Sequence, residues 1–131
     1  MRIALLTSLQ SEENILPLVA SRLREKIVNV EVQMHVANSN LALVGDISKY
    51  SGRELVVVAL FYSEETHDVR SVMDAIIFAS GSGANVLSFV EKIVEFEAPR
   101  EAERISESVF TRLFGSKPKK PQRETGSISE L

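Results

Sequence analysis

The sequence predicts an α/β domain built on an open, parallel β-sheet with helices on both faces. Four short apolar segments alternate along the chain with four segments whose apolar residues recur at helical spacing. This alternation is typical of β-α-β units joined by right-handed crossovers. In such sheets ligands bind outside the carboxyl ends of the strands, near the point where the strand order reverses. The sequence therefore indicates where a site should lie before it indicates any chemistry.

The composition limits the kinds of protein that this chain can be. Its 131 residues match one domain, and its 44% apolar and 25% charged residues are typical of a soluble globular protein. A net charge of -3 predicts neither a nucleic-acid nor a membrane partner. The absence of cysteine excludes a thiol nucleophile, a disulfide scaffold and a zinc–thiolate site. Residues 2–6 have the character of a first strand rather than a signal peptide, so we expect a cytoplasmic protein.

The first half of the chain predicts two strands and two helices. Residues 2–7 form an apolar run, and the capping residues at 11–14 precede a helix whose first turn holds Pro17. Residues 28–36 alternate between apolar and polar types, which predicts a half-buried edge strand. A short helix follows and ends near Gly52. The predicted apolar stripes of the two helices are Ile15, Leu18, Val19, Arg22, Leu23 and Lys26, then Leu41, Val44 and Ile47.

The second half contains the strongest strand signal. Residues 55–62 are continuously apolar, as expected for a central strand, and residues 85–90 predict a further buried strand. Pro99 suits the first turn of the last helix. The stripes of the two helices are Val69, Val72, Met73, Ile76 and Ala79, then Ala102, Ile105, Val109 and Leu113. We expect one domain over residues 1–115 and a flexible tail over residues 116–131, where little can be buried.

The residues present argue against the ligand sites that are familiar in this architecture. The turn after the first strand, residues 7–10, holds no glycine, so it does not predict a dinucleotide or flavin mononucleotide loop. The glycines of residues 81–83 precede a strand rather than a helix, which is the wrong context for a phosphate loop. A phospho-receiver domain needs acidic residues where Ser8 and Tyr62 stand.

The sharpest polar cluster is residues 63–68, directly after the central strand. A helix N-terminus there offers free N–H groups and positive potential to an anionic ligand group. His67 is able to exchange a proton near neutral pH, with Glu65 or Asp68 orienting it. The simpler interpretation is that hydroxyl and acidic residues such as Thr66 cap the helix while His67 is solvated.

The other polar residues leave two interpretations open. Asn38, Ser39 and Asn40 follow the second strand and either cap a helix or contact a ligand. His35 shares the polar face of the second strand with Glu31 and Gln33, which favours an exposed or interface histidine over a catalytic one. The two histidines give no metal-binding spacing, and no metal is expected. The charges of residues 95–97 and 101–104 are interpreted as a solvated helix face.

From Arg2 to about Pro118 the layout resembles the lumazine synthases and the related archaeal-type riboflavin synthases. Lumazine synthases follow the central strand with Glu-Thr-x-His, and this chain has Glu65, Thr66 and His67 after residues 55–62. Residues 100–118 are more similar to the riboflavin synthases. The resemblance implies a flavodoxin-like three-layer sandwich with strand order 2-1-3-4. It also implies a homo-oligomer, a five-subunit ring in these families.

The resemblance also implies an activity and a set of site residues. The expected function is riboflavin synthase, which dismutates 6,7-dimethyl-8-ribityllumazine, with lumazine synthase as the close alternative. His67 would move protons and the aromatic rings would stack on the substrate, and no cofactor is implied. Arg100 and Arg104 are the nearby candidates for a phosphate-binding arginine. The expected substrate-binding residues are Ser8, Asn38, Ser39, Asn40, Phe61, Tyr62, Glu65, Thr66 and Asp68.

A second hypothesis belongs to another class of protein. The Pro-Gly turn after the second strand and the aromatic residue after the first strand, both usual in lumazine synthases, are missing here. A paralogue that kept the fold and lost catalysis would bind a flavin-like ligand or another protein. The fold cannot decide between these hypotheses, because one scaffold hosts many functions.

Overall fold

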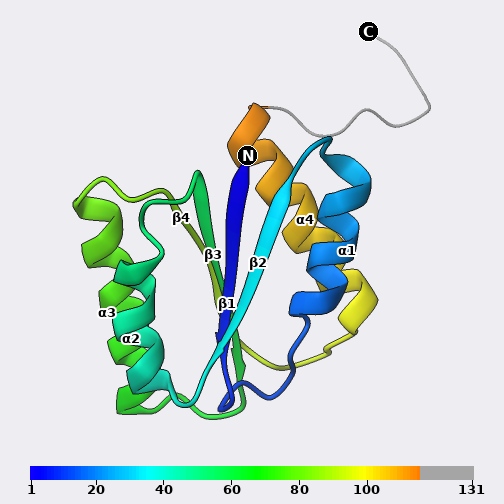
Figure 1. Cartoon of the computed structure of the whole chain (residues 1–131). Coiled ribbons are helices and arrows are strands. Elements are labelled where there is room, and N and C mark those ends of the chain that lie inside the picture. The colour runs from blue at the N-terminus through cyan, green and yellow to red at the C-terminus, as the bar shows by residue number, and fades with distance from the viewer. Residues whose placement is uncertain (116–131) are drawn as a thin grey trace, which may run out of the picture.

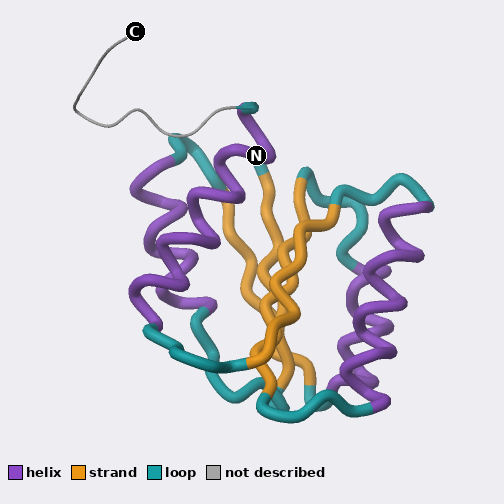
Figure 2. The backbone as a smooth tube through the Cα atoms, turned by 180° about the vertical axis from the view of Figure 1, so that it is seen from behind, coloured by secondary structure: helices purple, strands orange, loops and turns teal. Residues whose placement is uncertain are grey.

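The computed structural model describes residues 1–115 as three layers, with a β-sheet between two pairs of helices (Figure 1). All strand pairs are parallel, and the strand order is β2-β1-β3-β4. Helices α1 and α4 cover one face of the sheet, and α2 and α3 cover the other, as the view from behind also shows (Figure 2). The predicted flavodoxin-like sandwich with strand order 2-1-3-4 is therefore confirmed.

The elements follow the predicted order with small shifts in their ends. The second strand begins three residues later than predicted, because Asn29 has a left-handed φ of 58° and Val28 is 84% exposed. The predicted tail over 116–131 lies outside the described residues. The bounds are β1 (Arg2–Ser8), α1 (Leu16–Lys26), β2 (Glu31–Ala37), α2 (Asn40–Lys49), β3 (Leu55–Tyr62), α3 (His67–Gly81), β4 (Val86–Lys92) and α4 (Ala98–Phe114).

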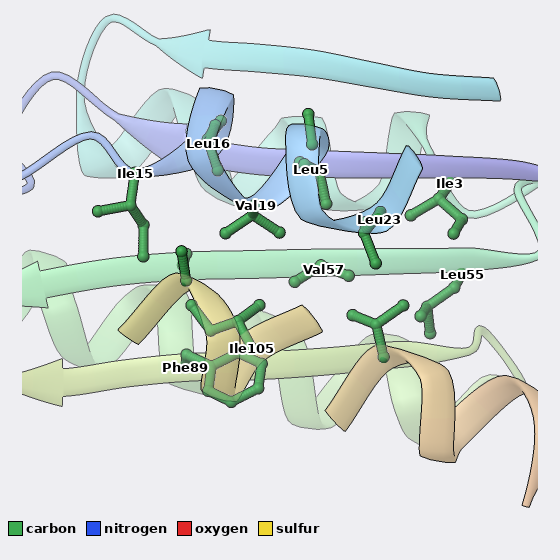
Figure 3. Close-up of a cluster of buried hydrophobic side chains, with 14 of the residues drawn as sticks. Ile3, Leu5, Ile15, Leu16, Val19, Leu23, Leu55, Val57, Phe89 and Ile105 are labelled. Atoms are coloured by element: carbon green, nitrogen blue, oxygen red, sulfur yellow. The ribbon is translucent and has the colours of Figure 1, made fainter. Parts of the chain in front are cut away.

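Two apolar cores lie on the two faces of the sheet. Alternate residues of the central strands point to opposite faces, so Leu5 and Val57 meet α1 and α4, while Leu6 and Val58 meet α2 and α3. In Figure 3 the α1 side chains Leu16, Val19 and Leu23 lie over the first of these cores, with Ile105 from α4. No helix within residues 1–115 is long and apolar enough to cross a membrane.

The buried faces of α1 and α2 are rotated from the predicted stripes. Leu18 is 37% exposed and Leu41 is 59% exposed, whereas Leu16 and Leu43 are buried. The buried residues of α1 are Leu16, Val19, Ala20 and Leu23, which have the i, i+3, i+4, i+7 spacing of a helix packed on a sheet. The prediction included Ile15, which is buried but precedes the helix, and this choice shifted the expected face.

Charges predicted to form a solvated face of α4 instead join α4 to its neighbours. Glu103 bonds Arg22 at 2.7 Å and Lys26 at 2.8 Å, both on α1. Arg104 bonds Glu91 of β4 at 2.6 Å. The solvated-face interpretation is therefore wrong for these residues, because the helical stripe that buries Ala102 and Ile105 brings their charged neighbours to the rims of the interface.

The Glu103 cluster predicts an acid-dependent contribution to stability. The Lys26 ammonium, followed by the Arg22 guanidinium, holds the pKa of Glu103 below its ordinary value of 4.5. Because the folded state then binds fewer protons than the unfolded state, the stabilisation is complete above pH 4.5 and is lost as the pH falls further. We expect Glu103→Gln to lower the free energy of unfolding at pH 7, with the gap to the wild type closing in acid. Urea denaturation at a series of pH values measures this gap, and a gap that does not change with pH would contradict the assignment.

Candidate functional site

The carboxyl ends of the four strands meet at one edge of the sheet, where the predicted site residues also lie (Figure 1). Three loops gather there around the two inner strands: the β1–α1, β2–α2 and β3–α3 loops. Since the strand order reverses between β1 and β3, this edge contains the crevice in which open α/β sheets bind ligands. The hydrogen bonds at this edge decide which of its groups are free for a ligand.

The backbone amides of residues 9–12, the first half of the β1–α1 loop, all donate within the chain. Leu9 N–H donates to the Ala37 carbonyl at 2.9 Å, and Glu12 N–H donates to the Phe61 carbonyl at 2.7 Å. The amides of Gln10 and Ser11 donate to the Ser8 hydroxyl and carbonyl, at 3.2 and 3.1 Å. An anion cradle needs several free N–H groups, so residues 9–12 do not provide one.

Side chains of the same loop fasten it across the end of β3. The Phe61 N–H donates to Ser11 Oγ at 3.0 Å, and Ser63 Oγ donates to Glu12 Oε2 at 3.0 Å. The loop therefore spans the crevice between β1 and β3. Residues 11–14 were predicted only as capping residues ahead of a helix that begins near Asn14, so the bonds of Ser11 and Glu12 to the end of β3 were not anticipated; α1 begins at Leu16. The one available sign of this was that Ser11 and Glu12 lie several residues before Leu16, the first buried residue of α1.

Ser8 and Asn40 form a buried pair beneath this edge. Their exposed fractions are 2% and 3%, and Ser8 Oγ donates to Asn40 Oδ1 at 2.5 Å. The Asn40 N–H donates to Gln10 Oε1 at 2.7 Å. Both residues were predicted to contact a substrate. The structure places their polar groups against each other, where they fix the start of α2.

The polar residues that follow β2 and β3 divide into caps and accessible side chains. Ser39 Oγ accepts the Ala42 N–H at 3.1 Å, and Thr66 Oγ1 accepts the Val69 N–H at 3.3 Å, as helix N-caps do. Asn38 is exposed. These residues directly precede two neighbouring helices, α2 and α3, which start at the same edge.

His67 is the first residue of α3, and its side chain is exposed. Among residues 1–115 no partner hydrogen bonds to its ring, so both ring nitrogens face solvent or an incoming ligand. Asp68 is half-buried beside it, and Glu65 is paired with Arg70 at 2.7 Å. The imidazole is thus accessible, and neither neighbouring carboxylate hydrogen bonds to it.

The two aromatic residues at the end of β3 differ in accessibility. Phe61 is 2% exposed, and its ring packs edge-on against Phe96 with centroids 4.9 Å apart. Tyr62 is half-buried and lies on the α2 and α3 side of the sheet. Tyr62 is therefore the ring better placed to meet a ligand, because stacking on Phe61 would first require Phe96 to move.

A cavity of about 320 Å³ opens at the same edge, on the α4 side of β3 and β4. Phe61 and the candidate phosphate-binding Arg104 line it, together with Phe96, Lys92 and Glu101. Arg104 bonds Glu91 at 2.6 Å and Glu101 at 2.8 Å, and the Glu91 bond raises the pKa of its guanidinium. Arg100 donates to the Glu95 carbonyl. The charge of Arg104 is therefore already neutralised by carboxylates.

His35 lies away from this edge and is bonded within the chain. Its Nε2 is 2.7 Å from Asp46 Oδ2 on α2, and its ring centroid lies 5.6 Å from that of Tyr50. The expected exposed or interface histidine is half-buried here, because α2 covers the face of β2 that carries it. His35 and His67 therefore do not act together in one site.

Neither a metal-binding cluster among the described residues nor a known relative indicates the chemistry of this edge. Within residues 1–115 no three histidine, aspartate or glutamate side chains come close enough together to hold a metal ion. No protein-family model matches the chain, and no curated protein is significantly similar to it in sequence.

The buried Ser8–Asn40 bond predicts a measurable cost of mutation. Ser8→Ala leaves the Asn40 carbonyl oxygen buried without its donor, so we expect the free energy of unfolding to fall by about 1–3 kcal/mol. Chemical denaturation measures the change. Ser51→Ala is the control, because Ser51 is exposed and its loss should cost less than about 0.5 kcal/mol. Equal effects of the two substitutions would show that the buried bond contributes nothing.

Proposed function

We propose that this protein is a riboflavin synthase that converts two molecules of 6,7-dimethyl-8-ribityllumazine into riboflavin and a pyrimidine. The observation that carries the proposal is the accessible His67 at the start of α3, at the carboxyl end of the central strand β3. Glu65, Thr66 and His67 resemble the lumazine synthase motif, and this resemblance suggests a lumazine as the ligand at that position. The strand order 2-1-3-4 agrees with this family of enzymes.

The proposed reaction makes modest demands on the protein. Two flat rings must be held together, and protons must leave and return to their methyl groups, so positioning and proton transfer are the main contributions. We assign proton transfer to His67. Asn38 supplies hydrogen bonds to a ring edge, and Tyr62 supplies a stacking surface. Ser8 and Asn40 support these residues by fixing the start of α2, because their own polar groups are occupied.

Lumazine synthase is the less favoured activity for this edge. Its substrate carries a phosphate, which requires an anion site. The amides of residues 9–12 are occupied, and Arg104 is paired with Glu91 and Glu101. A non-catalytic protein that binds a lumazine or flavin remains the second candidate, because Ser8, Asn40 and Phe61 are buried rather than presented to a ligand.

The proposal includes a ring of subunits with shared sites. The polar face of β2 suggested a subunit boundary, yet Gln33 and His35 both bond residues of their own chain. Exposed apolar residues elsewhere, such as Ile77 at 69% and Phe78 at 73% on α3, are better suited to contact another copy. We expect sedimentation at micromolar concentration to show an oligomer, and a monomer would remove the shared-site part of the proposal.

The catalytic part is tested by mixing the purified protein with 6,7-dimethyl-8-ribityllumazine and following riboflavin by its absorbance. We expect turnover in proportion to protein concentration, and His67→Ala should lower it roughly a hundredfold or more, as loss of a general acid–base group does. Glu64→Gln is the control, since Glu64 is exposed at the same edge and has no assigned role.

The outcomes separate the hypotheses. Unchanged turnover in His67→Ala would remove His67 from the mechanism. Tight binding of the lumazine without turnover would favour the non-catalytic candidate. Neither binding nor turnover would refute the whole flavin assignment.

A further inference from the structure

A second polar cavity lies at the end of the sheet opposite the candidate site. Its volume is about 300 Å³, and it is lined by Arg2, Ile3, Glu31, Val32, Gln33 and Arg53. Arg2 and Glu31 are partners in the parallel register at the amino ends of β1 and β2. Arg53 lies between the end of α2 and the start of β3. Two guanidinium groups therefore border one cavity.

Neutral partners hold Arg53 in place. Its Nη2 donates to Gln33 Oε1 at 2.8 Å, and its guanidinium carbon lies 5.2 Å from the centre of the Tyr50 ring. An amide and an aromatic ring orient a guanidinium without cancelling its charge. Among the described residues no carboxylate lies within ion-pair distance of Arg53. Its charge and remaining N–H groups are thus available.

Arg2 is the second arginine of the lining. Within residues 1–115 its guanidinium makes no ion pair, although Arg22, Arg70 and Arg104 each do. The nearby Glu54 carboxylate is engaged by the Arg2 backbone N–H, at 2.6 Å, which lowers the pKa of Glu54. Among the described residues the lining contains two arginines and one acid, Glu31, and the charge of Arg2 also contributes to lowering the pKa of the neighbouring Glu54.

We propose that this cavity binds the phosphate group of a small anion, with Arg53 and Arg2 as its donors. A guanidinium presents parallel N–H groups that match phosphate oxygens, and an oriented one loses less entropy on binding. The proposal also explains the polar face of β2, since Gln33 is the residue that orients Arg53. A glutamate at that position would neutralise the arginine.

Calorimetric titration of the full chain at low ionic strength tests the proposal, with inorganic phosphate and glycerol phosphate as probes. We expect saturable binding by the wild type and a loss of at least about tenfold in affinity for Arg53→Gln. Arg53→Lys keeps the positive charge but lacks the parallel N–H groups of the guanidinium, so it should retain only part of the affinity. Glu31→Gln removes the opposing carboxylate and should tighten binding. A preference between the probes identifies a free ion or a phosphate ester.

Two further variants keep the result decisive. Arg24→Gln makes the same change in net charge on the exposed side of α1, and it should leave the affinity unchanged. Gln33→Glu places a carboxylate against Arg53 and should abolish binding even if Arg53→Gln proves poorly folded. Absence of saturable binding by the wild type would overturn the proposal. So would an equal loss in Arg24→Gln and Arg53→Gln, which would show that the arginines act only through net charge.

Discussion

The structure depends on the burial of the two inner strands from both sides. In β3 every residue from Leu55 to Phe61 is buried, and in β1 every residue from Ile3 to Ser8 is buried. Each large apolar side chain removed from water in this way contributes about 1.5–3 kcal/mol. A strand buried on both faces needs two layers of helices, and parallel strands need crossovers that supply them. The three layers, the strand order and the shared carboxyl edge all follow from this requirement.

The elements were predictable wherever local pattern and burial agree. The continuous run at 55–62 identified β3 to the residue, and Pro99 marked the first turn of α4. Prediction failed where distant residues decide the outcome. The face of α1 was misjudged because Ile15, which lies in the loop before the helix, is also buried in the core on that face of the sheet. Phe61 of β3 packs against Phe96, which lies far along the chain in the loop between β4 and α4. No local pattern reports such a contact.

The candidate site was predictable in position but only partly in detail. The strand-end rule predicted the carboxyl edge of the sheet, where the structure brings the predicted residues together. For Ser39 and Thr66, capping was one of two open interpretations, and their hydroxyls do cap α2 and α3. Which polar groups at this edge are bonded within the chain and which are free for a ligand was not predictable, because hydrogen bonds between loops decide it. Ser8 and Asn40 satisfy each other, and Ser11 and Glu12 join the first loop to β3. Accessible chemistry is left chiefly to His67, Asn38 and Tyr62.

The pairing of α1 with α4 also determines the order in which the chain completes its structure during synthesis. Arg22 and Glu103 are 81 positions apart, and α4 supplies Ala102, Ile105 and Val109 to the core that α1 begins. Until α4 leaves the ribosome, the face of β1 and β3 that α1 and α4 cover in the folded protein is covered by α1 alone. A nascent chain in this condition exposes apolar surface, and exposed apolar surface promotes aggregation.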